Sequence, residues 1–235
     1  MHSSSARLWM GVILAIGLAV GSFFLFYGND NGEEALSNNE IVTTGTGAKF
    51  IHSGEAIRLE ILEGSSVRYL VGEQLARRDL PNDAIGITSE VIGEIFLDKS
   101  GVVDKDNSKI VVKLDSLESD DSRRDNYLKT RTLIGSAQFP EAIFIPEEVS
   151  GLDWPIKEGG QLVFEIVGEM AIRGTTKPMT WTVEAILEQG LITGHADTRF
   201  YFSDYGIPKP TLLFILSMDD EIRLEADLIM RVTEE

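Results

Sequence analysis

The feature that most limits the fold is a strict alternation of apolar and polar residues along several segments. In residues 222–231, Ile222 and every second residue after it are apolar, and most of the positions between them are charged. Residues 161–173 follow the same pattern, with Phe164 and Met170 on the apolar face. A period of two with one polar face is typical of an antiparallel strand that packs on one side only.

Shorter segments with the same period fill much of the chain after residue 48. In the segment 85–97, Ile85 and Ile87 share a parity with Val91, which places them on one face. Residues 122–130 lack the alternation and open with capping residues, so we expect one short helix there. With the two long segments this makes about eight strands, which predicts an all-β antiparallel barrel or sandwich. The shorter segments are 57–61, 67–71, 85–97, 110–114, 181–187 and 198–202.

An uncharged apolar stretch of twenty residues, 8–27, stands near the N-terminus. As a helix rising 1.5 Å per residue it would span the roughly 30 Å hydrocarbon core of a bilayer. The alternative is a cleaved signal peptide, whose apolar region is shorter and ends at small residues. Cleavage after Gly21 would leave Phe23 and Phe24 at the new terminus of a soluble protein. We therefore expect an uncleaved transmembrane helix.

The charges that flank this stretch predict its orientation. Arg7 precedes it, whereas Asp30 and Glu33 follow it. The positive-inside rule then places the short N-terminus in the cytoplasm and the rest of the chain outside the cell membrane. The expected organisation is a cytoplasmic tail (1–7), a single-pass helix (8–27), a flexible linker rich in Gly, Asn and Ser (28–47) and an extracytoplasmic barrel domain (48–235).

Composition removes several classes of function. The chain has no cysteine, so disulfides and thiolate metal sites are excluded. Its net charge of −17 repels phosphate backbones, and nucleic acid is not an expected partner. The three histidines, His2, His52 and His195, have no partner at metal-ligand spacing, and no nucleophile elbow or P-loop is present. We expect no metal, no cofactor and no catalytic group.

Four segments, in the same order along the chain, resemble the YceI family. The pair IRGTTKP and RRDNYLK is the most specific part of the resemblance. Tyr127 stands where the family often has His, and Asp204, Tyr205 and Gly206 replace its Asp-Phe-Gly turn; these departures leave the headgroup preference open. The segments are SSVRYLVGEQL (65–75), GITSEVIGEIFLD (86–98), VVKLDSLESDDSRRDNYLKT (111–130) and VGEMAIRGTTKPMTWTVEA (167–185).

The resemblance implies a lipocalin-like barrel of eight strands that encloses a long isoprenoid or acyl tail. Small residues on the apolar parity would leave space for it, although parity alone also allows a filled core. An arginine at a barrel mouth can hold a headgroup, and the alternative is a structural Arg–Asp pair. The expected lining is Tyr69, Val91, Ile95, Phe164, Ile166, Met170, Trp181, Val183 and Phe200, and the headgroup candidates are Arg124, Asp125 and Tyr127.

The expected function is therefore to bind an elongated amphipathic lipid of the polyisoprenoid, quinone or acyl type, for storage, transport or protection. An N-terminal anchor would keep the barrel beside the membrane that holds this ligand. One alternative is a ligand-free barrel that acts as an extracytoplasmic interaction module. Another is a lipid-modifying enzyme, but the sequence offers no recognisable nucleophile, base or metal cluster for it.

Overall fold

The structure is a computed structural model that describes residues 56–76, 79–130, 134–153 and 156–234. The predicted membrane span, the linker and the start of the barrel domain lie outside these ranges. Within them, no helix has the length and apolarity needed to cross a membrane. The strands are β1 (Ile57–Ile61), β2 (Ser66–Leu75), β3 (Asn82–Thr88), β4 (Val91–Leu97), β5 (Lys109–Lys113), β6 (Glu118–Ser119), β7 (Glu141–Ser150), β8 (Gln161–Ile172), β9 (Thr175–Glu188), β10 (Leu191–Tyr201), β11 (Ile215–Met218) and β12 (Glu221–Glu234); the helices are α1 (Ser122–Leu128) and the 3-10 helix η1 (Phe202–Tyr205).

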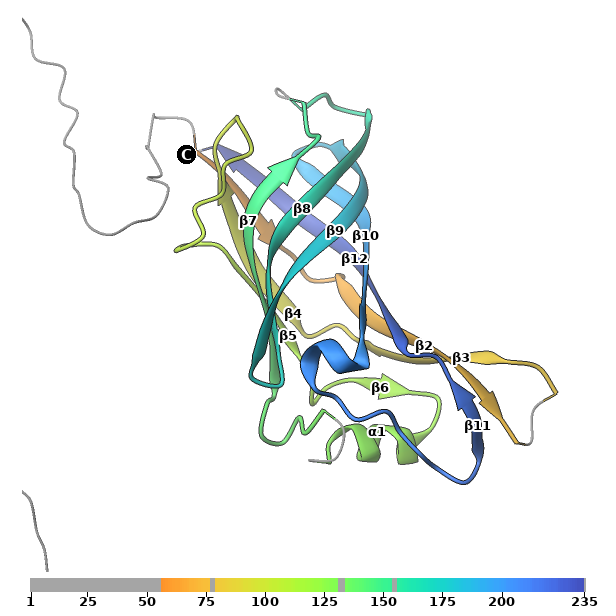
Figure 1. Ribbon diagram of the computed structural model, residues 1–235. Coiled ribbons are helices and arrows are strands. Elements are labelled where there is room, and N and C mark those ends of the chain that lie inside the picture. The colour runs from red at the N-terminus through yellow and green to blue at the C-terminus, as the bar shows by residue number, and fades with distance from the viewer. Residues whose placement is uncertain (1–55, 77–78, 131–133, 154–155, 235) are drawn as a thin grey trace, which may run out of the picture. The chain divides into compact units, whose positions relative to one another are not determined.

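Eight of the described strands pair in a closed antiparallel barrel. Their order is β1-β4-β5-β7-β8-β9-β10-β12, and β1 pairs with β12 to close the ring. The longest ladders join β8 to β9 and β10 to β12, which contain the two segments with the clearest alternation. The predicted all-β antiparallel barrel with one short helix is confirmed (Figure 1).

At one end the barrel wall extends beyond the ring. The long strand β12 pairs with β1 near its C-terminal end and with β2 nearer its start. Strand β2 in turn pairs with β3 and β11. Figure 1 shows β2, β3 and β11 reaching away from the barrel at the end that also carries α1 and η1, opposite the C-terminus. Loops and a helix, in addition to the paired strands, therefore surround this end of the barrel.

The segment 85–97 corrects one sequence prediction. Ile85 and Ile87 are 42% and 45% exposed, whereas Val91 and Ile95 are 5% and 1% exposed, so the four do not share a face. The regular strand is interrupted between β3 and β4, where the Glu90 N–H donates to the Thr88 hydroxyl. A slip of one residue moves every following side chain to the other face of a sheet. This interruption therefore places Val91 and Ile95 of β4 on the inner face.

Strand β7 was not expected from the sequence. It contains Pro146, and a proline inside a run of residues argues against a central strand. Here the pairing of β7 with β8 shifts register between Pro146 and Glu148, so the proline lies at a bulge. Strand β11 was also missed, and β10 begins at Leu191 rather than near Thr198. The predicted helix is confirmed in shorter form, and the Asp121 side chain caps it by accepting from the Arg123 N–H.

A substitution at Gly168 tests how closely the barrel wall packs beside this bulge. A Cβ added there would lie 2.2 Å from the Ile145 carbonyl oxygen and 2.8 Å from the Pro146 Cα, and neither backbone atom can move freely. We expect Gly168→Ala to lower the free energy of unfolding by about 1–3 kcal/mol through overpacking. Denaturant unfolding of the full chain measures it. Gly160→Ala, where the nearest atom is 3.5 Å away, is the matched control, and equal stability of the two variants would contradict the expectation.

Candidate functional site

The barrel encloses a cavity of about 500 Å³. This volume falls within the range of about 300–1,000 Å³ that is usual for small-molecule sites. Its wall is formed by inner-face side chains of the strands and is mostly apolar. Small side chains on the inner face help to leave this space open, because larger ones would fill it. They include Ala84, Ala142, Ala185, Ala196 and Ala226, all of which are buried and line the cavity.

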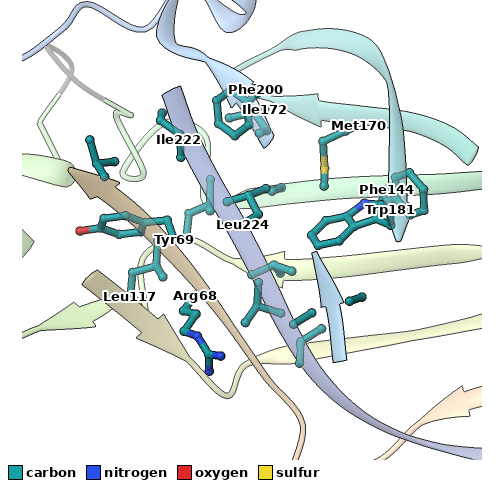
Figure 2. Close-up of a pocket in the computed structure, with 18 of the residues that line it drawn as sticks. Arg68, Tyr69, Leu117, Phe144, Met170, Ile172, Trp181, Phe200, Ile222 and Leu224 are labelled. Atoms are coloured by element: carbon teal, nitrogen blue, oxygen red, sulfur yellow. The ribbon is translucent and has the colours of Figure 1, made fainter. Parts of the chain in front are cut away.

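All nine residues predicted to line the interior lie on the cavity wall: Tyr69, Val91, Ile95, Phe164, Ile166, Met170, Trp181, Val183 and Phe200. Their contact with a ligand stays a prediction. The prediction missed Phe144, because its strand β7 was not expected. The Phe144 ring meets the Trp181 ring edge-on, with centroids 6.3 Å apart. Figure 2 shows these side chains, together with Met170 and Leu224, around the cavity.

The cavity opens at the end that carries α1. There its lining includes Arg123, whose side chain is 85% exposed, and Phe214, which is 51% exposed. Near the opposite end the lining residues Leu59, Leu97 and Ile192 are at most 5% exposed. We call the α1 end the mouth. A ligand can therefore enter from one end and extend toward a closed end.

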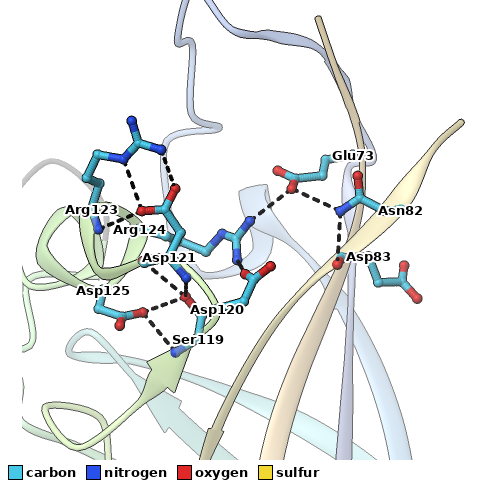
Figure 3. Close-up of polar contacts among 9 residues, drawn as sticks. All are labelled: Glu73, Asn82, Asp83, Ser119, Asp120, Asp121, Arg123, Arg124 and Asp125. Atoms are coloured by element: carbon cyan, nitrogen blue, oxygen red, sulfur yellow. Dashed lines mark hydrogen bonds and ion pairs between the residues drawn. The ribbon is translucent and has the colours of Figure 1, made fainter. Parts of the chain in front are cut away.

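Arg124 lies at the mouth between two carboxylates (Figure 3). Its guanidinium is 3.0 Å from Glu73 Oε1 and 2.5 Å from Asp120 Oδ1. The Glu73 side chain is only 3% exposed and also accepts a hydrogen bond from Asn82 Nδ2 at 3.3 Å. Because Glu73 belongs to β2, the ion pair fastens α1 to the barrel wall. Arg124 therefore forms a structural ion pair, and its partner is Glu73 instead of Asp125.

The other two headgroup candidates lie in different places. Tyr127 lines the cavity beside Arg124, whereas Asp125 is not among the lining residues. Asp125 Oδ1 instead accepts from the Ser119 N–H at 3.0 Å and from the Ser119 hydroxyl at 2.6 Å. These bonds hold the loop that precedes α1. Asp125 therefore shapes the mouth, and only Arg124 and Tyr127 of the three can reach a ligand directly.

Glu73 is the mouth residue that the sequence prediction overlooked. It shares its parity with Tyr69 and Val71, two inward residues of β2, and it is 4% exposed as a whole residue. A carboxylate on an otherwise apolar face was the available signal. Buried charges are paired in proteins, so a carboxylate at this inward position predicts a cation close to it.

Two hydrogen-bonding groups on the cavity wall have no protein partner. The Tyr69 hydroxyl and the Trp181 indole Nε1 are both buried, and neither makes a hydrogen bond to any residue that the structure describes. Burial raises the pKa of the Tyr69 hydroxyl well above its ordinary value, so this group stays protonated at neutral pH. Trp181 is 8% exposed, and its N–H can only donate. Both atoms are enclosed by the surrounding protein and have almost no surface open to the cavity.

The comparisons with known proteins agree with this geometry. The family model described as "YceI-like domain" matches residues 78–230. The chain belongs to the YceI-like domain family. Among curated relatives, a UPF0312 protein of Yersinia pestis is 31% identical over 85 residues, which are 36% of this chain and 39% of that protein. A UPF0312 protein of Enterobacter is 31% identical over 91 residues, 39% of this chain and 42% of the relative. The chain thus spans about two fifths of the curated relatives that it matches.

Solved structures of YceI-like and related barrels share the fold. A polyisoprenoid binding domain from Saccharophagus degradans superposes with a TM-score of 0.56 at 10% identity, covering 75% of this chain and 98% of that one. BcnA of Burkholderia cenocepacia gives a TM-score of 0.53 at 13% identity, with 70% and 95% covered. The YCEI protein of Campylobacter jejuni gives 0.50 at 17% identity, with 69% and 90% covered. At these identities the likeness establishes the fold.

Proposed function

We propose that the barrel binds one elongated amphipathic lipid, with its tail in the cavity and its polar group at the mouth. The observation that carries the proposal is an apolar cavity of about 500 Å³ that is closed at one end and polar at the other. A hydrocarbon tail gains about 0.8 kcal/mol for each methylene buried in such a space. The related barrel described as a polyisoprenoid binding domain supports a tail of that class. Storage, transport or protection of the lipid would follow from its enclosure.

We also propose that residues 8–27 anchor the barrel to the outer side of the cell membrane. Tethering would keep the barrel close to the bilayer that supplies the lipid and raise the effective concentration of the ligand. Apolar side chains beside the mouth would ease its passage, since Phe214 and Leu216 are 51% and 66% exposed.

Native mass spectrometry of the full chain, isolated from membranes, tests both proposals on one sample. We expect one lipid per chain and an intact mass that still includes residues 8–27. The lipid should leave when the protein is unfolded and return on refolding with membrane extract. A chain that never carries or takes up lipid would make the barrel a filled interaction module, and a mature terminus near Ser22 would rule out the anchor.

A further inference from the structure

The turn that leads into β11 exposes large apolar side chains at the mouth. Residues 210–218 (PTLLFILSM) contain no charged side chain. Within them Leu213 is fully exposed, and Phe214 and Leu216 are 51% and 66% exposed. We call these three residues the apolar tip. Single exposed apolar residues are common on protein surfaces, but a cluster of large ones marks a site of contact with another protein or with a membrane.

Backbone hydrogen bonds hold the apolar tip in this exposed position. The Ala76 N–H donates to the Phe214 carbonyl at 3.0 Å, and the Ile215 N–H closes the turn by donating to the Leu212 carbonyl at 2.9 Å. Strand β11 then pairs with β2, and Figure 1 shows both strands reaching away from the barrel. The exposed side chains of the turn could fold back onto the barrel only if these bonds were broken. The apolar tip therefore projects into the space beyond the mouth.

The apolar tip is continuous with the wall of the cavity. Leu212, Phe214 and Ile215 line the cavity, whereas Leu213 and Leu216 do not line it and are exposed. One turn therefore contributes side chains to the cavity and to the outer surface. A partner that covers the apolar tip would lie directly beside the opening of the cavity.

Size and charge indicate which kind of partner fits the apolar tip. A specific protein interface usually involves about 20–30 residues on each side, far more than this turn offers. Attachment to a bilayer has no such minimum, because burial of apolar area among lipids adds up residue by residue. The turn has no cation to attract an anionic headgroup, and the chain has a net charge of −17. Apolar burial in a zwitterionic bilayer is therefore the contact that these residues favour.

We propose that the apolar tip inserts into a zwitterionic bilayer, at the boundary between headgroups and acyl chains, and so places the mouth on the membrane surface. The choice of a bilayer as the partner rests on the proposed lipid-binding function, because a lipid that leaves a membrane for the cavity must do so beside the mouth. The insertion itself needs no ligand in the cavity. It can therefore be measured separately from lipid binding.

The proposed anchor is compatible with this orientation. Strand β1 begins at Ile57, which pairs with Leu97 at the closed end. Residues 28–55 separate the apolar stretch 8–27 from the described barrel, and 28 residues can extend to about 90 Å. The 14 residues of β12, among the longest strands, span only about 45 Å. The connecting segment is therefore long enough for the mouth, at the opposite end, to reach the bilayer.

The test places a fluorescent label on the apolar tip. Because the chain has no cysteine, Leu213→Cys creates a single labelling site. The labelled full chain is reconstituted with phosphatidylcholine vesicles in which some acyl chains carry a quencher. We expect the emission to shift to the blue and most of it to be quenched. Leu191→Cys, at a leucine that is 37% exposed at the closed end, is the matched control and should show neither change.

A second variant tests whether apolar burial drives the insertion. Leu213→Glu, read with a label at Leu216→Cys, should lose most of the quenching, and high salt should leave the quenching of the parent protein unchanged. Transfer of a prenyl lipid from vesicles to the barrel should slow at least about tenfold, because the buried leucine is lost. Uptake of a short prenyl lipid dissolved in water should stay the same, as should the melting temperature. Leu191→Glu is the matched control and should change none of these values.

The outcomes separate the inference from the function on which it rests. Quenching at Leu213 but not at Leu191 would establish the insertion, whereas failure of the unmodified chain to take up dissolved prenyl lipid would remove only the lipid-binding function. Equal quenching at both sites, or none at Leu213, would overturn the inference. A blue shift without quenching by the lipids would also overturn it, by showing that a second copy or another part of this chain covers the apolar tip. Loss of quenching at high salt would do the same, because it would show attachment through charge.

Discussion

Met170→Trp is expected to lower lipid affinity at least about a hundredfold while the lipid-free protein keeps its melting temperature. Met170 lies on the cavity wall, 4% exposed, two residues before the end of β8 on the side of the mouth. A tryptophan there would occupy the space through which a tail passes. Excluding only a few methylenes at about 0.8 kcal/mol each accounts for a loss of this size. Melting temperature and bound lipid are measured on the same sample of the full chain.

Met179→Trp is the matched control, because Met179 is buried to a similar extent, at 7% exposed, but does not line the cavity. The same added bulk should there cost about 1–3 kcal/mol as overpacking and lower the melting temperature, with lipid affinity retained at temperatures where the variant is folded. A lowered melting temperature for Met170→Trp, with no lipid detected on the unmodified chain, would show that the interior is a filled core.

The parts of the fold that were predicted from the sequence are those fixed by local alternation. The ladders β8–β9 and β10–β12 contain the segments with the cleanest period of two, and the inward set that includes Phe164, Met170 and Trp181 follows directly from it. Local alternation predicts the wrong face where the parity changes within a segment. The parity changes at the two residues between β3 and β4, so Ile85 faces outward while Val91 faces inward, and no residue type in that segment predicts the change.

Strand β7 shows a second limit, because its place is decided by tertiary pairing. A proline was compatible with the strand only because the pairing with β8 shifts register next to it. Long-range contacts also decide the chemistry of the mouth. Glu73 and Arg124 are 51 positions apart in the chain, so the sequence showed an inward carboxylate and a candidate arginine but not that they meet. Likewise, Trp181 was expected on the wall, but the lack of a partner for its N–H is visible only in three dimensions.

The pairing of Glu73 with Arg124 leads to the second large expected effect, which is on stability. Arg124→Leu would leave the Glu73 carboxylate, 3% exposed, without its guanidinium. Breaking a buried ion pair by removing one partner usually costs about 3–5 kcal/mol. We expect about 2–4 kcal/mol here, toward the lower end because Arg124 itself is 20% exposed and Asn82 still donates to Glu73. Denaturant unfolding of the full chain measures the difference.

The double variant Glu73→Leu/Arg124→Leu identifies the cause. Replacing both charges with apolar side chains of comparable size removes the buried, unpaired carboxylate, so most of the lost stability should return. Because the Arg124 guanidinium is already occupied by Glu73 and Asp120, the double variant should also still take up an uncharged prenyl quinone. Arg123→Leu, which removes an arginine whose side chain is 85% exposed, is the matched control and should change stability little. If Arg124→Leu and the double variant were as stable as the unmodified chain but both lost the quinone, Arg124 would instead hold the headgroup itself.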